Sequence, residues 1–527
     1  MRVVCVGGGP GGLFFAALVK RADPSIEVIV YERNRPDDTF GFGVVFSDAT
    51  LATLAAADDI LANRLSTRGE YWDRISVRLK GERVECGGNG MAAIMRKELL
   101  SLLTERAIEA GVDIRWQSEV PSLAEVQGAD LIVASDGANS RIRNEMAAVF
   151  KPRIETATAK FIWFGTTYRF DGLTFLFEHG PHGTFAVHGY PISSTLGTFI
   201  VETDEPSWRR AGLDEFQASQ PSGASDMKSK AYIEELFAGQ IDGHELVVNN
   251  SRWSNFSTVR NERWSNGNVV LVGDAAHTAH FSVGSGTKMA MEDAASLATH
   301  VLAHPSDMAY ALREYEAERR PQVERIQNSA GPSLSWWEHF GSYYESRPPV
   351  QFAFHFLTRS ISHDRIKTRD PEFVASVHDW WECQRVSSAL QPNETSLDGI
   401  GAVLRTVTVR SGPGDHLVAD FAGRSEVPLF WQMPIDLADG PWGLLVSLDV
   451  DVEVNIEPLK FSSSHPPSFI AIDGGSPQER VSAADAIGRS SKLPVMVIDD
   501  EPSEDRVLTL LLSGRASLIG VSEVVSA

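Results

Sequence analysis

The spacing of apolar residues at the start of the chain predicts a strand, a helix and a second strand. An apolar run covers residues 2–6, helical spacing follows at 11–20, and a second apolar run covers 27–31. A glycine-rich turn separates the first strand from the helix. The first run is short and lacks the cleavage site of a secretory leader, so it is interpreted as a buried strand. This order predicts a βαβ unit, in which a nucleotide would lie at the glycine turn.

The same periodicities predict further elements along the chain. Leucines at helical spacing predict a helix at 91–110, and alternation with frequent Gly and Pro predicts an antiparallel sheet at 160–203. The remaining expected elements are strands at 129–134, 268–273, 403–409 and 494–498, and helices at 286–300 and 310–330. Since 527 residues exceed one ordinary core, more than one domain is expected.

Composition excludes several classes of function. Hydrophobic residues make up 43% and charged residues 22%, the balance of a globular protein, and no apolar run is long enough for a membrane helix. The formal charge of −22 argues against nucleic-acid and anionic-membrane partners, which require clustered Lys and Arg. Three scattered cysteines, Cys5, Cys86 and Cys383, form neither a disulfide framework nor a metal-ligand spacing. A reduced, cytoplasmic setting is expected, and the sequence does not decide whether the chain forms a homo-oligomer.

The glycine turn carries the dinucleotide-binding pattern G-x-G-x-x-G. Its expected cofactor contacts are Gly7, Gly9, Pro10, Gly11 and Gly12. Glu32 follows Gly12 by 20 residues, at the end of the second strand, where a carboxylate can accept hydrogen bonds from a ribose. Arg33 beside it is a further candidate. The glycines would let backbone N–H groups approach a pyrophosphate, and a simple strand-to-helix turn is the alternative.

A second candidate site follows the strand at 268–273. Asp274 stands at the strand end, and a glycine turn then opens the next helix. Asp274 could hold a ribitol hydroxyl, and the amides of the turn could stabilise negative charge on a reduced flavin. The alternative is an N-capping aspartate. The expected cofactor contacts of the turn are Gly284, Gly286, Thr287 and Lys288.

These motifs together resemble the class A flavoprotein monooxygenases related to para-hydroxybenzoate hydroxylase. Asp136-Gly137 matches the family signature associated with FAD and NAD(P)H, and Arg96 matches its flavin-contacting arginine. Without the family resemblance, Asp136-Gly137 is equally a plain turn, and Arg96 is equally a solvated residue. The resemblance implies FAD, reduction by NADH or NADPH, reaction with O2, and oxygen transfer from a flavin C4a-hydroperoxide to an aromatic ring.

The resemblance also implies a fold and a domain order. The expected fold is α/β: a Rossmann-like FAD-binding region at 1–345, an inserted antiparallel substrate sheet at about 151–260, and a smaller C-terminal α/β domain at 396–527. A helical linker is expected at 346–395. Segments at 492–498 and 513–520 faintly resemble the end of an old-yellow-enzyme-like barrel. The C-terminal domain is therefore either a shortened barrel remnant, without a second flavin site, or an unrelated packing domain.

One departure from the family narrows the expected substrate. His280-Phe281 replaces the Pro pair of most members, and with the segment 41–48, which includes the candidate Val44, it is similar to salicylyl-CoA 5-hydroxylases and to the monooxygenase half of 2-aminobenzoyl-CoA monooxygenase/reductase. A violacein-pathway tryptophan hydroxylase has a similar loop. The leading expected reaction is salicylyl-CoA, NADH and O2 to gentisyl-CoA. The alternatives are 2-aminobenzoyl-CoA, an indole-type substrate, and a flavin-binding protein without oxygenation.

Three residues are candidates for the chemistry on the substrate. His280 lies in the loop expected at the flavin edge, where an imidazole could accept a phenolic proton. His188 and Tyr190 share one face of an expected strand by period-two alternation, and they could line the substrate cavity. Loop packing for His280 and a structural role for His188 are the alternatives.

Overall fold

In the computed structural model the chain forms two compact units, Met1–Gly341 and Ser342–Ala527. The structure describes residues 1–36, 38, 41–216, 223–281, 286–386, 393–412, 416–431, 440–448 and 466–523. Gly284, one of the expected cofactor contacts, lies outside these residues. Within them, no helix combines the length and the hydropathy needed to cross a membrane.

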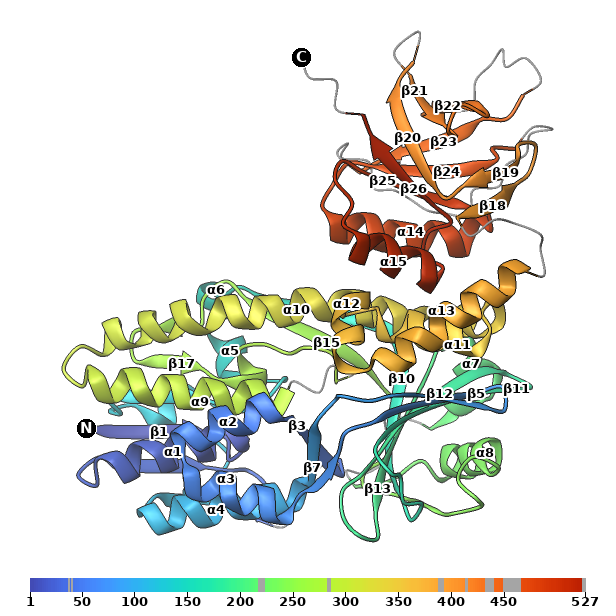
Figure 1. Ribbon diagram of the computed structural model, residues 1–527. Coiled ribbons are helices and arrows are strands. Elements are labelled where there is room, and N and C mark those ends of the chain that lie inside the picture. Colours follow the sequence, from blue (N-terminus) through green and yellow to red (C-terminus); the bar gives the residue numbers. More distant parts are fainter. Residues whose placement is uncertain are drawn as a thin grey trace. The chain divides into compact units, whose positions relative to one another are not determined.

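The first unit contains the expected nucleotide-binding sheet. Its strand order is β16-β17-β9-β1-β2-β8, and all neighbours after β16 are parallel (Figure 1). The strands are β1 (Arg2–Val6), β2 (Glu27–Tyr31), β8 (Asp113–Arg115), β9 (Leu131–Ala134), β16 (Ser265–Asn266) and β17 (Val269–Leu271). Helix α1 (Pro10–Ala22) connects β1 to β2, so the predicted βαβ unit is confirmed. Strands from both ends of the unit's sequence meet at β9, so the chain leaves and re-enters this domain.

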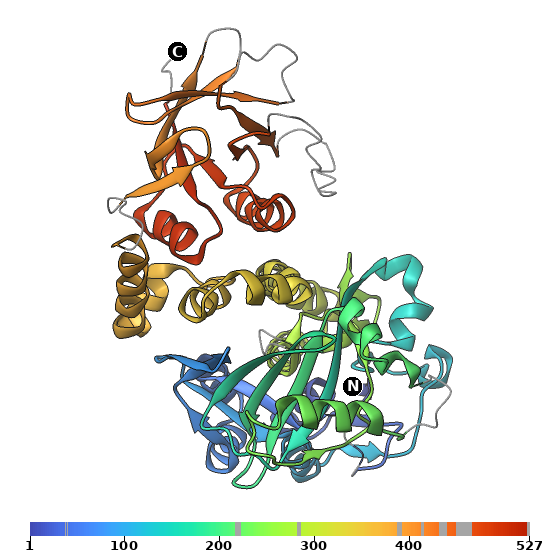
Figure 2. The same cartoon turned by 90° about the vertical axis from the view of Figure 1, so that its right-hand side faces the viewer.

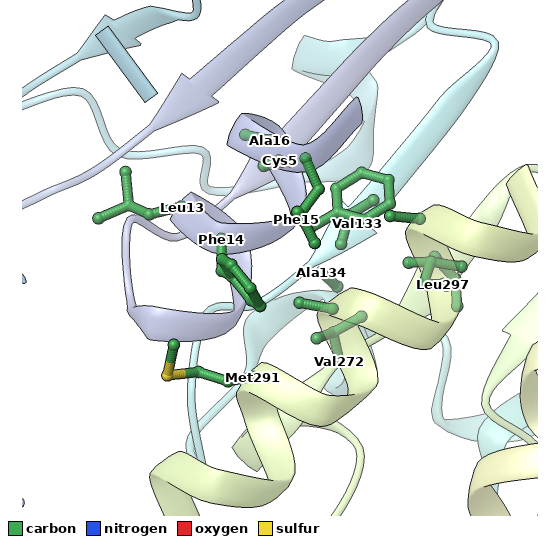
Figure 3. Packing of buried hydrophobic residues seen from close by; sticks show 14 of the residues in the cluster. Cys5, Leu13, Phe14, Phe15, Ala16, Val133, Ala134, Val272, Met291 and Leu297 are labelled. Atoms are coloured by element: carbon green, nitrogen blue, oxygen red, sulfur yellow. The ribbon is translucent and has the colours of Figure 1, made fainter. Parts of the chain in front are cut away.

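The core of this domain is formed where α1 and α9 (Gly286–Ala303) pack together against the sheet. Phe14 and Phe15 of α1 are fully buried, and Figure 3 shows them near Val133 of β9, Val272 just beyond β17 and Leu297 of α9. Each fully buried side chain of this size contributes roughly 1.5–3 kcal/mol. This packing fixes the N-terminal ends of both helices beside the carboxyl ends of the strands.

A large antiparallel sheet forms the other half of the first unit. Its order is β14-β10-β13-β12-β11-β5-β6, with β15 also paired to β10. The strands are β5 (Ile75–Leu79), β6 (Glu82–Cys86), β10 (Pro152–Thr166), β11 (Leu173–Gly180), β12 (Gly183–Pro191), β13 (Gly197–Thr203), β14 (Leu246–Val247) and β15 (Ser254–Asn261). The predicted sheet at 160–203 is confirmed. The sheet also takes β5 and β6 from earlier in the chain, because β5 pairs with β11 in parallel.

The two faces of this sheet have different coverings. One face packs on helix α8 (Met227–Phe237), whose Ile233 and Phe237 join Phe164 and Val187 of the sheet, and Figure 2 shows this green helix over the strands. The opposite face carries His188 and Glu202 and meets aromatic side chains of helix α10 (Met308–Ser346). That second face is therefore the side on which the candidate chemistry lies.

The predicted helix at 91–110 begins later than expected. Residues Met91–Met95 form strand β7, and helix α4 covers Arg96–Ala110. Strand β7 pairs with β3 (Gly43–Ser47) and β4 (Glu70–Trp72), which buries its apolar residues in a three-stranded sheet. Tertiary pairing thus overrides the helical spacing, and it makes Arg96 the first residue of the helix.

The described part of the first unit also contains further short helices. These are α2 (Asp48–Ala57), α3 (Asp59–Arg68), α5 (Arg141–Glu145), α6 (Ala147–Phe150) and α7 (Glu205–Arg210) with the 3₁₀ turns η1 (Leu123–Val126), η2 (Leu213–Glu215) and η3 (Gly273–Ala275). A loop at 135–140 leads from β9 into α5, and η3 begins just after β17 ends. Both turns therefore open at the carboxyl edge of the parallel sheet, the edge at which α/β proteins bind ligands.

The second unit consists of short helices followed by a closed barrel. Helices α11 (Pro349–Leu357), α12 (His363–Arg369) and α13 (Pro371–Val386) precede a hairpin, β18 (Glu394–Leu397) and β19 (Gly401–Leu404). The barrel comprises β20 (Thr406–Ser411), β21 (Leu417–Asp420), β22 (Glu426–Phe430), β23 (Gly443–Ser447), β24 (Phe469–Asp473), β25 (Val495–Asp499) and β26 (Leu518–Ser522). Helices α14 (Pro477–Ser491) and α15 (Glu504–Ser513) lie on its outside (Figures 1 and 2). The predicted α/β character of the C-terminal domain is confirmed.

Candidate functional site

The glycines of the N-terminal loop are needed for two different reasons. A Cβ on Gly7 would lie 2.3 Å from the carbonyl oxygen of Ser135, and one on Gly12 would lie 2.3 Å from the carbonyl oxygen of Gly7. These positions are closed by backbone. A Cβ on Gly9 would meet nothing nearer than 4.0 Å, so Gly9 faces open space. Gly7 and Gly12 therefore permit the fold, whereas Gly9 leaves room for a ligand.

The N-terminus of α1 is prepared for an anion. Gly9 is the N-cap residue and supplies no side-chain cap, and Pro10 occupies the first helical turn. The first amides of a helix carry partial positive charge and need acceptors. Gly11 packs tightly instead, since a Cβ there would lie 3.1 Å from Val272 and from the Ala290 carbonyl. A diphosphate placed against Gly9 would satisfy these amides.

Glu32 holds the glycine loop as well as facing the site. Its Oε2 accepts a hydrogen bond from the Gly8 amide at 2.7 Å, and its Oε1 accepts from the amide and side chain of Asn34 at 2.8 and 2.7 Å. A carboxylate has about four acceptor positions, so capacity for a ribose hydroxyl remains. Arg33 is exposed beside it.

The Asp136 turn is tied to the Asp274 turn through an arginine that the sequence did not single out. Asp136 Oδ2 accepts from the Arg141 amide at 2.8 Å, while its buried Oδ1 has no hydrogen-bond partner among the described residues. Arg143 is buried and donates to the carbonyls of Ala138 and Ala275 at 2.6 and 3.2 Å. Its signal was weak, because an Arg in a polar run is typical of a solvated surface.

Asp274 and Arg96 lie close enough for their charges to affect each other. The carboxylate is exposed and the guanidinium partly exposed, yet protein surrounds both. Burial raises the pKa of Asp274, and the nearby Arg96 charge opposes that shift. Burial likewise lowers the pKa of Arg96, opposed by Asp274 and Tyr190. Two charges held in this way are expected where a polar ligand completes their surroundings.

Helix α9 begins beside Asp274. A Cβ on Gly286 would lie 4.0 Å from Asp274 Oδ1, which places the start of the helix next to the carboxylate. Thr287 and Lys288 follow in the first turn, both partly exposed, and Lys288 Nζ lies 3.8 Å from Glu292 Oε1. The predicted proximity of Asp274 to the start of this helix is therefore a feature of the structure.

A buried ionic network fixes the turn that carries Asp274. Asp293 of α9 accepts from the Gly273 amide at 3.1 Å, lies 2.7 Å from His277 Nε2 and accepts from Arg319 Nε at 2.8 Å. Burial opposes ionisation of Asp293, but the charges and hydrogen bonds of His277 and Arg319 outweigh it and lower its pKa. Sequence reasoning missed Asp293 and Arg319. An acid on the apolar face of α9 was the available signal.

The structure brings two of the three catalytic candidates together. His188 Nε2 lies 2.6 Å from Oε1 of Glu202, and His280 Nε2 lies 3.6 Å from Oε2 of the same carboxylate. All three residues are at most 4% exposed. Trp337 packs 4.3 Å from the His188 ring, and Phe281 packs 4.3 Å from the His280 ring, measured between centroids. Glu202 was not predicted.

Tyr190 lies at the side of this cluster and contacts strand β3. Its hydroxyl donates to the Gly43 carbonyl at 3.3 Å, and its ring stacks on Trp72 with centroids 5.9 Å apart. Burial raises the pKa of Tyr190 far above its ordinary value, so the phenol stays neutral. The neighbouring Val44 is buried in the core of the nucleotide-binding domain. Tyr190 also lies within electrostatic reach of Arg96, so the large antiparallel sheet and the charged residues near α9 influence each other.

Comparison with known proteins gives these sites a family. The model of the FAD binding domain matches residues 124–330, and that of lycopene cyclase protein matches residues 2–171. A salicyloyl-CoA 5-hydroxylase from a Streptomyces species is 51% identical over 528 residues, covering 99% of each chain. The chain belongs to the class A FAD-dependent monooxygenases. FAD is accordingly the cofactor of this monooxygenase and NAD(P)H its electron donor.

Other relatives match a smaller share of this monooxygenase. A 3-hydroxy-4-methyl-anthranilyl-[aryl-carrier protein] 5-monooxygenase from Streptosporangium sibiricum is 37% identical and covers 64% of this chain and 89% of its own. Among solved structures, p-nitrophenol 4-monooxygenase from Pseudomonas putida has a TM-score of 0.55 at 18% identity, covering 71% of this chain and 96% of its own. At this identity the structural likeness supports the fold alone.

The residues present fit FAD. The open space at Gly9 and the amides of α1 suit a diphosphate, and Glu32 retains capacity for a ribose. Asp274 and Arg96 are two interacting charges beside the start of α9, which suits the polar flavin end. When bound, FAD carries electrons from NAD(P)H and the oxygen atom that is transferred to the substrate.

Proposed function

We propose that this monooxygenase hydroxylates salicylyl-CoA, or a related aryl-CoA thioester, at the carbon para to the ring hydroxyl, using NADH and O2 and giving gentisyl-CoA. The observation that carries the proposal is the extent of the 51% identity, which covers 99% of both chains. The aryl-carrier relative, in contrast, covers 64% of this chain. An enzyme aligned over its whole length with a named salicyloyl-CoA 5-hydroxylase is best assigned the same substrate class.

In this proposal the chain's residues bind, orient and exclude water. Gly9, Glu32 and Asp136 would hold the adenosine diphosphate half of FAD, and Asp274 and Arg96 the flavin half. The amides at Gly286 would stabilise negative charge on the ring. Phe281 and Trp337 would keep water from the reacting carbon, since a dry site limits loss of oxygen as peroxide.

His280 is the residue proposed to act on the substrate. A neutral imidazole can accept a hydrogen bond from the phenolic hydroxyl, which raises electron density at the para carbon as oxygen is transferred. His188 and Tyr190 are proposed to line the substrate cavity. For Tyr190 the support is its position between the sheet and Arg96, and its neutral hydroxyl makes it a positioning group.

The second candidate is a related thioester with an amino group on the ring. It is favoured by the 37% identity to a 5-monooxygenase whose substrate is named as an anthranilyl group on an aryl-carrier protein. The two named relatives share an aromatic acyl thioester, so the thioester is the common element. A free indole is less well supported, since the protodeoxyviolaceinate monooxygenase of Chromobacterium violaceum is 29% identical.

The division of labour along the chain is also proposed. Residues 1–345 would carry the chemistry, 346–395 a helical linker, and 396–527 a shortened barrel that binds no second flavin. The closed barrel of β20 to β26 favours a barrel remnant over an unrelated packing domain. A cytoplasmic location is proposed from the three scattered cysteines, whose spacing is not that of a disulfide framework. Measuring the molecular mass in solution tests whether the chain forms a homo-oligomer.

Anaerobic stopped-flow reduction tests the substrate class. The protein with FAD is mixed with NADH and one of salicylyl-CoA, 2-aminobenzoyl-CoA, free salicylate or tryptophan. Salicylyl-CoA is expected to accelerate flavin reduction most, and free salicylate to have little effect. Faster reduction with free salicylate or tryptophan would overturn the thioester assignment, and replacement of NADH by NADPH identifies the donor.

A further inference from the structure

A buried carboxylate lies between the two histidines. Glu202 of β13 is 1% exposed, with His188 2.6 Å from one of its oxygens and His280 3.6 Å from the other. His188 pairs with Ile200 across the sheet and Glu202 pairs with Ala186. His188 and Glu202 are therefore diagonal neighbours on one face, a position fixed by strand register.

The surroundings of this carboxylate are aromatic. Phe161 stands opposite Glu202 on β10, and its ring packs 4.9 Å from Phe281. Phe256 covers the His280 ring at 5.0 Å, and Trp337 covers His188. A carboxylate in such surroundings is costly unless a cation or strong donors face it. The imidazoles of His188 and His280 can face the carboxylate as hydrogen-bond donors or, when protonated, as cations.

The geometry points to Glu202 as a positioning residue that acts through His280, an inference that rests on the proposed hydroxylation. We propose that Glu202 stabilises His280 when it takes the proton of the substrate hydroxyl, and that His188 anchors the carboxylate from the other side. The O–H bond of the substrate breaks, its proton moves to a ring nitrogen of His280, and the electron pair stays on the oxygen. No oxidant or reductant is consumed by this step.

The three groups would share their protons. Two histidines and one glutamate within hydrogen-bond or ion-pair distance titrate as a set. Among the described residues, the titratable groups facing His280 include Glu202 from β13 and, behind it, His188 from β12, while Phe256 of β15 and Phe281 pack on the ring. Removing the negative charge should make His280 a weaker base, since a nearby carboxylate favours imidazolium.

The test compares Glu202→Gln with Glu202→Asp and with a matched control in the same sheet. The control is Glu178→Gln on β11, where Glu178 Oε2 accepts from Gln240 at 2.6 Å and belongs to no part of the proposed site. FAD content, substrate-stimulated NADH oxidation, product per NADH and the pH profile of product formation are measured for each. The pKa of His280 is measured by NMR with isotope-labelled histidine, in samples without substrate, and its signal is assigned with His280→Gln.

Glu202→Gln should keep FAD and NADH oxidation but form product about 10- to 100-fold more slowly, the effect of losing a charged hydrogen-bond partner. The pKa of His280 and the acidic limb of the profile should both move to lower pH. Glu202→Asp should recover part of the product yield, and Glu178→Gln should match the wild type. Unchanged product per NADH and an unchanged His280 pKa in Glu202→Gln would overturn the inference.

Two complications are separated by design. If Glu202→Gln does not fold, Glu202→Asp decides, because a shortened carboxylate must alter coupling and the His280 pKa if Glu202 acts through that ring. If wild-type protein makes no product from any thioester, the proposed function fails, while the NMR titration still supports or overturns the effect of Glu202 on His280.

Discussion

The glycine loop allows a paired prediction in which two similar substitutions have opposite effects. A Cβ at Gly12 would lie 2.3 Å from the Gly7 carbonyl and 2.4 Å from the Ser135 hydroxyl, so backbone must move. Overpacking of this kind costs about 1–3 kcal/mol of folding stability. Gly9 has φ −75° and ψ 177°, which alanine adopts freely, and its Cβ would enter open space. Gly9→Ala should therefore change the free energy of unfolding by less than about 0.5 kcal/mol.

Gly9→Ala should instead weaken the binding of FAD. The new methyl group would stand where the diphosphate meets the first amides of α1. Losing a hydrogen bond to a charged group costs about 1.5–3 kcal/mol, or roughly a 10- to 100-fold rise in Kd. The assay is urea unfolding of FAD-free protein together with titration of FAD by fluorescence. Gly239→Ala is the matched control, because nothing lies within 4 Å of its added Cβ.

Two outcomes would contradict these roles of Gly9 and Gly12. If Gly9→Ala lost stability while its affinity for FAD stayed at the wild-type value, the loop would be a packing feature alone. If Gly12→Ala kept full stability, the close approach of the loop to Ser135 would be wrong.

Three further predictions concern the other parts of the site. Asp274→Ala should lower FAD occupancy, with activity partly restored by excess FAD; full occupancy with loss of hydroxylation alone would contradict the binding role. His280→Ala should retain FAD and NADH oxidation but release peroxide, with general-base loss worth about 10²–10⁴ in rate; undiminished product per NADH would reduce it to packing. Asp293→Asn should destabilise the FAD-binding domain by about 3–5 kcal/mol, because it breaks a buried ion pair. Since the pKa of Asp293 is lowered in the folded state, its contribution is present at neutral pH and is lost as pH falls below about 4. A wild-type loss of stability on acidification that persists unchanged in Asp293→Asn would count against this.

The sequence predicted those parts of the fold that local patterns determine. The βαβ unit and the antiparallel strands around His188 follow from periodicity, because the period of apolar residues is set by which face is buried. The start of α4 was misplaced because β7 is a strand only through its pairing with β3 and β4, which lie elsewhere in the chain. Tertiary pairing of that kind leaves no mark on the residues 91–95 themselves.

The candidate site was predicted only where a motif marks it. The positions of Gly9 and Asp274 follow from spacing within a short segment, and their roles as FAD contacts stay predictions. Glu202, Arg143 and Asp293 were missed, since each acts with a partner far away in sequence: Glu202 with His280, Arg143 with the Ala275 carbonyl, and Asp293 with Arg319. For Glu202 and Asp293 the available signal was a lone acid in an apolar strand or helix, whereas Arg143 stands in a polar run that is typical of a surface.

The central claim is that this monooxygenase inserts one oxygen atom of O2 into an aryl-CoA thioester. The most direct measurement incubates the protein with FAD, NADH, salicylyl-CoA and isotopically labelled O2, and identifies the product by mass spectrometry. We expect gentisyl-CoA that carries one labelled oxygen atom, formed in proportion to the NADH oxidised. NADH oxidation that yields only peroxide with every thioester, or a product without the label, would contradict it.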